Sequence, residues 1–222
     1  MNVVYNMDCM EGMKQYPDKY FDLAIVDPPY GLKYDTLAEK KGGTMWGNAV
    51  APMKKYHGGG WDIRPCEQYF QELIRVSKNQ IIWGGNYFID YLKPSKSFVC
   101  WDKRCLSKTS NNFADCEFAY MSESLGVARM FRFEWTGMLQ GDMAEKEKRI
   151  HPTQKPVALY EWLLRRYAKE GDKILDTHVG SGSSRIACEK LGFDFVGYEI
   201  DEYYWQEQEK RFQTEKWNIP LF

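Results

Sequence analysis

The residues best placed for chemistry are an acid and an aromatic ring separated by two prolines, Asp27, Pro28, Pro29 and Tyr30. They follow the apolar run of residues 21–26, which has the composition of a buried strand. Proline fixes its own φ angle and restricts the residue before it, so the carboxylate and the ring are held at a set separation at the end of the strand. Rigid geometry at that position suits a binding site. An acid followed by proline also forms ordinary turns, so both interpretations stay open on this stretch alone.

A second candidate site lies within residues 174–201. An apolar strand ends in Asp176, a turn containing Gly180 and Gly182 follows, a helix begins, and the next strand ends in Glu199. Glycine lets the backbone pass close to a ligand, and an acid at the end of the second strand can accept hydrogen bonds from a ribose diol. The run Gly-Ser-Gly-Ser-Ser-Arg is neither a Walker loop nor G-x-G-x-x-G. A nucleoside ligand without a phosphate chain, such as S-adenosylmethionine, therefore fits better than a nucleotide.

The composition sets limits on the class of protein. Hydrophobic residues make up 44% and charged residues 27% of the 222 residues, which is ordinary for a globular chain. The formal net charge is −1, so nucleic-acid binding would need a local basic patch. Six cysteines without a C-x-x-C pair, and only three histidines, argue against a metal site. No apolar run approaches membrane-span length and no signal-peptide core is present, so we expect a cytoplasmic protein with reduced thiols.

Short apolar runs alternate with amphipathic stretches along the chain, a pattern that predicts an α/β sheet in one domain. Helices are expected over residues 9–16, 65–78, 157–169, 183–192 and 201–217. Strands are expected over residues 2–6, 21–27, 80–85, 97–102, 116–122, 128–135, 173–178 and 194–200. Residues 123–127 are expected to join two of these strands as a hairpin.

Two stretches, residues 31–60 and 102–150, lack this regularity. The first carries five lysines against two acids, a local charge of +3. The second has basic residues clustered at Lys103, Arg104 and Lys108. A loop that long in a compact domain is usually functional or disordered, and its lysines could equally form a solvated face.

With both sites in view, the chain resembles the DNA amino-methyltransferases, which methylate exocyclic amines of adenine or cytosine. Residues 27–30 match the family's catalytic motif, D/N/S-P-P-Y/F/W. Residues 176–183 match its cofactor motif, D-x-F-x-G-S-G-T, with His178 in place of phenylalanine and Ser183 in place of threonine. A third motif, H-P-T-x-K-P, stands at residues 151–156. The catalytic motif precedes the cofactor motif, which looks like the permuted β group of that family.

The resemblance implies an α/β, Rossmann-like S-adenosylmethionine-dependent methyltransferase fold. Such a fold is a mostly parallel seven-stranded sheet with helices on both faces, here circularly permuted. Residues 2–6 would then form the strand beside the one that ends in Glu199. The whole chain, residues 1–222, would be a single methyltransferase domain with variable DNA-contacting segments near residues 31–60 and 102–150.

The resemblance also implies a set of site residues. Catalysis would use Asp27, Pro28, Pro29 and Tyr30, with the Asp27 carboxylate and the Pro28 carbonyl accepting from the target amine while Tyr30 stacks on the extruded base. The cofactor would be bound by Asp8, Thr153, Lys155, Asp176, Gly180, Ser181, Gly182, Ser183 and Glu199. DNA would be contacted by Lys40, Lys41, Lys54, Lys55, Lys103 and Arg104.

Two of these assignments have simpler alternatives. Asp8, implied beside the cofactor's adenine, is nearly as well explained as the N-cap of the helix that follows. Residues 151–156 would, by themselves, be only a turn before a helix.

These features predict site-specific methylation of the N6 amine of a flipped-out adenine in double-stranded DNA, as in restriction-modification systems. Cytosine N4 is the runner-up because both amines can use Asp-Pro-Pro-Tyr. A non-catalytic DNA-binding relative is disfavoured by the intact motifs. Pro65-Cys66 resembles the nucleophile of cytosine-C5 methyltransferases but lacks their other motifs. We expect S-adenosyl-L-methionine as cofactor, no metal and no membrane contact, and the sequence leaves a homodimer open.

Overall fold

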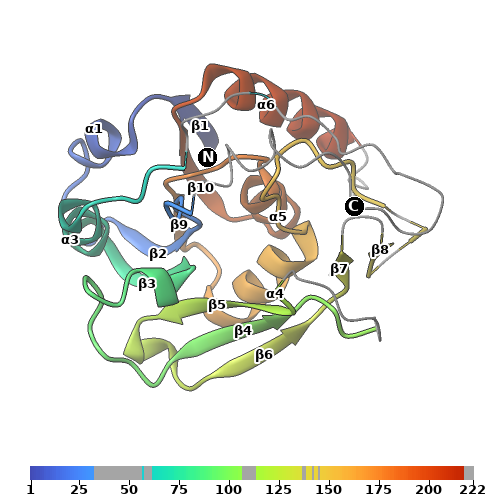
Figure 1. Cartoon of the computed structure of the whole chain (residues 1–222). Helices are drawn as coiled ribbons and strands as arrows, with labels where there is room; N and C mark the ends of the chain where they lie inside the picture. The colour runs from blue at the N-terminus through green and yellow to red at the C-terminus, as the bar shows by residue number, and fades with distance from the viewer. Residues whose placement is uncertain are drawn as a thin grey trace.

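The computed structural model describes residues 1–32, 57, 62–106, 114–136, 139–141, 143–144 and 146–217. Its centre is an eight-stranded sheet in the order β1-β10-β9-β2-β3-β5-β4-β6 (Figure 1). The strands are β1 (Asn2–Asn6), β2 (Phe21–Val26), β3 (Ser77–Trp83), β4 (Phe98–Asp102), β5 (Cys116–Met121), β6 (Arg129–Arg132), β9 (Lys173–Asp176) and β10 (Asp194–Glu199). The short strands β7 (Trp135–Thr136) and β8 (Leu139–Gln140) form a separate antiparallel pair.

The sheet is mostly parallel, as predicted, because every strand in it except β5 runs in the same direction. Strand β1 pairs with β10, and Asn6 lies opposite Glu199. Strand β10 in turn pairs with β9, and Gly197 lies opposite Asp176. The carboxyl ends of β1, β10, β9 and β2 therefore meet at one edge of the sheet, where α/β folds bind ligands.

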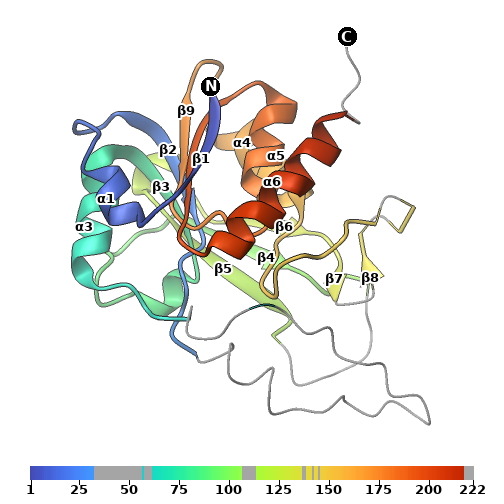
Figure 2. The same cartoon turned by 90° about the horizontal axis from the view of Figure 1, so that it is seen from above.

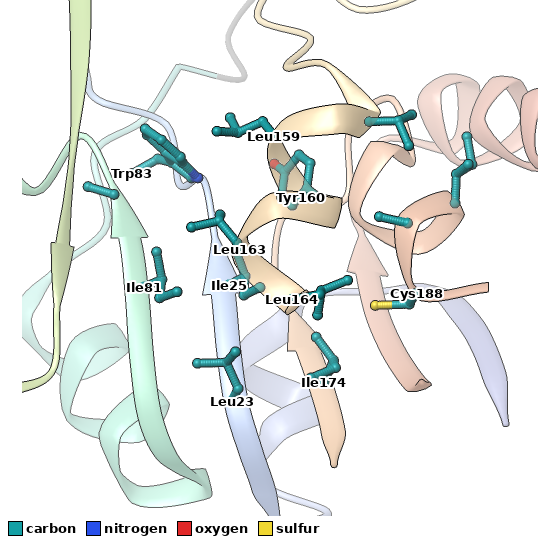
Figure 3. Close-up of a cluster of buried hydrophobic side chains, with 14 of the residues drawn as sticks. Leu23, Ile25, Ile81, Trp83, Leu159, Tyr160, Leu163, Leu164, Ile174 and Cys188 are labelled. Carbon is teal, nitrogen blue, oxygen red and sulfur yellow. The ribbon is translucent and has the colours of Figure 1, made fainter. Parts of the chain in front are cut away.

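Helices cover both faces of the sheet (Figures 1 and 2). Helices α1 (Cys9–Met13) and α3 (Glu67–Val76) lie on one face, and α4 (Val157–Tyr167), α5 (Ser183–Leu191) and α6 (Glu202–Trp217) lie on the other. Side chains alternate across a strand, so successive residues of β2 enter different cores. Leu23 and Ile25 belong to the core that includes α4, as Figure 3 shows, and Ala24 and Val26 belong to the core that includes α3. Both cores hold the end of β2 in place.

The sequence-based hairpin was wrong. Residues 123–127 contain a 3-10 turn, η2 (Glu123–Leu125), and β6 pairs in parallel with β4 instead of with β5. Both edges of β5 are already taken by β3 and β4, so β6 can only join the free edge of β4. This edge strand also makes the sheet one strand larger than the seven that the resemblance implied.

The helix expected over residues 65–78 ends early. Ser77 takes an extended conformation, with φ −121° and ψ 144°, and its N–H donates to the Leu73 carbonyl. Ser77 pairs with Phe21 as the first residue of β3, so sheet pairing overrides the amphipathic pattern. Strand β3 ends at Trp83 because Gly84 turns the chain with a φ of +67° into η1 (Gly85–Tyr87). In the described ranges, no helix is both long and apolar enough to cross a membrane.

Candidate active site

The Asp-Pro-Pro-Tyr motif directly follows β2 at the sheet edge, and the chain bends immediately after it, at Gly31 and Leu32. The Tyr30 hydroxyl donates to Asp27 Oδ1 over 2.7 Å, and the Lys155 ammonium donates to Asp27 Oδ2. The Asp27 side chain is only 14% exposed. The motif therefore does more than hold an acid and a ring at a set separation, because it brings them into direct contact.

The Tyr30 ring packs against the rings of Tyr87 and Phe88, a contact that the sequence gave no reason to expect. It stacks on Tyr87 of η1, with ring centroids 4.8 Å apart and planes inclined by 23°. A Cβ at Gly84 would lie 2.2 Å from the Tyr30 ring, so only glycine fits behind it. Burial raises the pKa of Tyr30 well above its usual range, and the nearby Asp27 and Glu117 charges add to the effect. The hydroxyl therefore stays protonated and remains a donor to Asp27.

The chain after Tyr30 is braced by the segment that leads into α3. The Gly31 N–H donates to Asp62 Oδ1 over 2.8 Å. The Arg64 guanidinium lies 4.6 Å from the centre of the Tyr91 ring and is paired with Asp90 at 2.8 Å. The segment that leads into α3 therefore contacts the chain directly after Tyr30, through the Gly31–Asp62 hydrogen bond.

Lys155, from the H-P-T-x-K-P motif, is the buried cation of the site, with a side chain only 4% exposed. Its ammonium lies between Asp27 and Glu117, whose Oε2 is 3.5 Å away, and 5.4 Å from the centre of the Trp83 ring. Burial alone would lower the pKa of Lys155, but the two carboxylates outweigh it and raise that pKa. The sequence predicted Lys155 at the methionine end of the cofactor. That role stays a prediction, because in this structure its ammonium contacts the catalytic motif.

Glu117 on β5 is a site residue that the sequence analysis missed. Its Oε1 accepts from the Lys103 ammonium over 2.8 Å, and its other oxygen faces Lys155. Burial would raise the pKa of Glu117, but Lys155 and Lys103 outweigh it and lower that pKa. One signal was available in the sequence. Glu117 shares the strand face of the buried residues Ala119 and Met121, where an acid needs a partner.

The glycine turn is closed by the acid at the end of β10. Glu199 accepts from the Gly180 N–H over 2.8 Å and from the Asp201 N–H over 2.9 Å. Gly180 and Gly182 take left-handed conformations, with φ of +52° and +78°. A carboxylate can accept about four hydrogen bonds, so Glu199 keeps the capacity to bind a ligand hydroxyl.

Serines and an arginine join the glycine turn to the rest of the site. The Ser183 hydroxyl donates to the Lys155 carbonyl over 2.7 Å and accepts from Arg211 of α6 over 2.9 Å. Arg211 also donates to the Ser181 carbonyl over 2.9 Å. The structure thus brings all three sequence motifs together. The Lys155 side chain reaches the catalytic motif, and its carbonyl binds the cofactor motif.

Comparison with known proteins places the chain in a family. A family model described as DNA methylase matches residues 21–210. The chain belongs to this family. Among its relatives, the Type II methyltransferase M2.DpnII of Streptococcus pneumoniae is 31% identical, in a match that covers 96% of this chain and 90% of the relative. The Type II methyltransferase M.HinfI of Haemophilus influenzae is 23% identical and is matched over 98% of this chain and 70% of its own.

Solved structures confirm the methyltransferase fold of this DNA methylase. The M1.HpyAVI–SAM complex aligns with a TM-score of 0.53 at 22% identity, over 95% of this chain and 100% of that one. The PvuII DNA methyltransferase, described as cytosine-N4-specific, aligns with a TM-score of 0.60 at 11% identity, over 99% and 93% of the two chains. Similarity at these identities shows the shared fold alone.

Asp8 and Thr153 are two further residues of the methylase that were predicted to bind the cofactor. Asp8 caps α1 by accepting from the Met10 N–H over 2.7 Å, so the simpler of its two interpretations holds in this structure. Thr153 is exposed, and its hydroxyl lies 3.0 Å from His151 Nδ1. Contact of Asp8 and Thr153 with a cofactor stays a prediction.

The predicted DNA-contacting residues fall into two groups. Lys40, Lys41, Lys54 and Lys55 lie outside the described residues. Lys103 is paired with Glu117, and the Arg104 guanidinium, in a side chain 6% exposed, is paired with Asp115 at 2.8 Å. A DNA contact by any of the six stays a prediction. Within the described ranges, His, Cys, Asp and Glu form no group of three or more that could hold a metal ion.

Asp176, at the end of β9, is a buried acid with an unusual titration. It accepts from the Ser184 hydroxyl over 2.5 Å and from the His178 N–H over 3.0 Å. Burial raises the pKa of Asp176 from 3.8 to about 7, although these two donors oppose the shift. Between these two values the folded protein holds a proton that the unfolded chain releases. The stability contributed by Asp176 therefore falls as the pH rises through this window.

Asp176→Asn removes this titration and keeps the shape of the side chain. We expect the free energy of unfolding of the variant, relative to wild type, to increase as the pH rises from 3.8 to about 7, by about 1.4 kcal/mol per pH unit at most. Urea denaturation of both proteins across this window measures the difference. A difference that stays constant with pH would contradict the raised pKa.

Proposed function

We propose that this DNA methylase transfers a methyl group from S-adenosyl-L-methionine to the N6 amine of adenine in double-stranded DNA. The observation that carries the proposal is the end of β2, where the Tyr30 hydroxyl donates to the Asp27 carboxylate, next to β9, the strand that leads into the turn closed by Glu199. The names of the relatives support methyl transfer, and the solved complex with SAM supports the cofactor. The position of β1 beside β10, in a chain whose catalytic motif comes first, supports the permuted β group.

The chemical difficulty is that the lone pair of an adenine amine is delocalised into the ring. Asp27 and the Pro28 carbonyl accept the two N–H bonds and so favour the pyramidal amine, whose lone pair is free to react. Bound S-adenosylmethionine supplies an electrophilic methyl group on a sulfonium. The amine lone pair forms the new C–N bond while the C–S bond breaks with its electron pair left on sulfur, and one amine proton passes to solvent. Asp27 can accept from the amine while it holds Tyr30 and Lys155, because each carboxylate oxygen has two lone pairs.

The polar groups at the carboxyl ends of β9, β10 and β1 fit the cofactor. Glu199 would accept from the ribose hydroxyls, and Asp8 would accept from the adenine amine of the cofactor. Gly180 and Gly182 leave the backbone of the turn without side chains, so a ligand can approach it closely. The polar side chains of Ser181, Ser183 and Asp176 are buried in and beside this turn. Thr153 would face the methionine end.

The experiment that tests the function identifies the methylated base. Unmethylated duplex DNA is incubated with the protein and labelled cofactor, then digested to nucleosides and analysed by mass spectrometry. We expect N6-methyladenine. Detection of N4-methylcytosine would instead show that cytosine is the target base. No incorporation of label by a folded, cofactor-binding protein would favour a non-catalytic DNA-binding relative.

Asp27→Ala should abolish methyl transfer and leave cofactor affinity largely unchanged, because the carboxylate acts on the target amine. Turnover is followed with labelled cofactor, and cofactor binding is measured by calorimetry. Lys155 keeps Glu117 as a partner in this variant, so we expect a folded protein of reduced stability. Near-normal turnover without the carboxylate would refute the role of Asp27.

Gly180→Ala should lower cofactor affinity at least tenfold, because the turn would have to leave its left-handed conformation. The matched control is Gly171→Ala, at a φ of +83° with no other atom within 4 Å of the added Cβ. Both changes should destabilise the fold by about 1–2 kcal/mol through backbone strain. Calorimetry separates them, and equal cofactor affinities would show that the Gly180 turn is only structural.

Tyr30 is proposed to stack on the extruded base through its ring. Tyr30→Phe keeps the ring and should keep most activity, although it removes the hydrogen bond to Asp27. Tyr30→Ala should lose about 1–3 kcal/mol of base stacking, which is roughly a 5- to 150-fold loss in DNA affinity. Melting temperature and DNA affinity are measured on both variants. If folded Tyr30→Ala binds DNA normally, the stacking role is refuted and the Tyr30 ring serves only in core packing.

A further inference from the structure

Four charged side chains alternate in sign across the site. Lys103, at the end of β4, pairs with Glu117 of β5, whose second oxygen faces Lys155, which pairs with Asp27 after β2. The proposed mechanism uses Asp27 directly but gives Glu117 no part. Glu117 is nevertheless the only carboxylate besides Asp27 that is paired with the Lys155 ammonium among the described residues.

The Lys155 ammonium and the target amine would both bind the Asp27 carboxylate, which has lone pairs for both but a single orientation. A buried ammonium beside a single carboxylate binds it strongly, since little water screens the pair. The target amine must approach the same carboxylate with its own N–H bonds. An ammonium shared between two carboxylates holds each of them less tightly, so Glu117 weakens the competition at Asp27 and keeps the ammonium in place.

We propose that Glu117 is a positioning residue for methyl transfer, which acts by sharing the Lys155 ammonium with Asp27. The inference rests on the proposed role of Asp27 at the target amine. Without the Glu117 charge, Lys155 turns fully to Asp27, and the amine meets a carboxylate that is oriented toward the ammonium. Glu117 contacts none of the residues proposed to bind adenosine, and the Lys155 ammonium that it pairs with is directed to Asp27. Its removal should therefore act on the transfer step more than on cofactor affinity.

Glu117→Gln removes the charge and keeps the shape of the side chain. The matched control is Glu209→Gln, which removes the same charge from an ion pair with the buried Arg185, whose side chain is 6% exposed. Unmethylated duplex DNA and labelled cofactor, both saturating, give the rate of methyl transfer in a single turnover. Calorimetry gives the cofactor affinity, and thermal unfolding gives the stability of each variant.

We expect Glu117→Gln to slow transfer by about 10- to 100-fold, the size of effect that a misplaced reacting group produces. Its cofactor affinity should stay within about twofold of wild type, which is well below the tenfold change that corresponds to about 1.4 kcal/mol of binding free energy. Glu117→Asp keeps the negative charge, but its shorter side chain places the carboxylate farther from the Lys155 ammonium. The rate of methyl transfer in this variant should therefore lie between those of wild type and Glu117→Gln. Glu209→Gln should lose stability and keep the wild-type rate.

The outcomes separate the inference from the function on which it rests. If Asp27→Ala is inactive while Glu117→Gln transfers methyl groups as fast as Glu209→Gln, the positioning role is overturned and the proposed function stands. If Asp27→Ala is active, the proposed function itself falls. Should Glu117→Gln not fold, Glu117→Asp carries the test, and a wild-type rate in that variant overturns the inference.

Discussion

The site depends on one constraint, that the buried ammonium of Lys155 must be paired. An unpaired charge at 4% exposure would be very costly, so the chain must bring carboxylates to it. Asp27 comes from the end of β2, and Glu117 comes from β5, 90 positions later in the chain. The Lys155 carbonyl also accepts a hydrogen bond from the hydroxyl of Ser183, which directly follows the glycine turn. Lys155 therefore holds together the segment that would act on the base and the segment that would bind the cofactor.

Sheet order makes this meeting possible. Strands β10, β9 and β2 lie side by side and run in the same direction, so Glu199, Asp176 and Asp27 reach one edge of the sheet from distant parts of the chain. Antiparallel β5 enters the same region from the other direction and brings Glu117 with it. The single reversal in the sheet thus adds a second carboxylate to the site.

The aromatic surroundings of Tyr30 add a second constraint. Its ring stacks on Tyr87 with Gly84 packed behind it, and its hydroxyl binds Asp27. The ring and the carboxylate therefore share one rigid arrangement, and the segment containing η1 supports both.

The sequence by itself determined the strands at the centre of the sheet, the α/β class and the three motifs, because these depend on local composition and spacing. Strands β9 and β10 are short apolar runs ending in an acid, and β2 is a short apolar run directly followed by one. Prolines follow β2 and glycines follow β9. Local patterns could not show which strand pairs with which, so the hairpin over residues 123–127 was wrong, although a strand was correctly expected within residues 128–135. Nor could they show which charges meet. Lys155 contacts Asp27, Lys103 contacts Glu117 and Tyr30 contacts Tyr87 only because sheet pairing and helix packing bring distant residues together. Ion pairs across a core are set by tertiary structure, since a buried charge takes the partner that the fold places beside it.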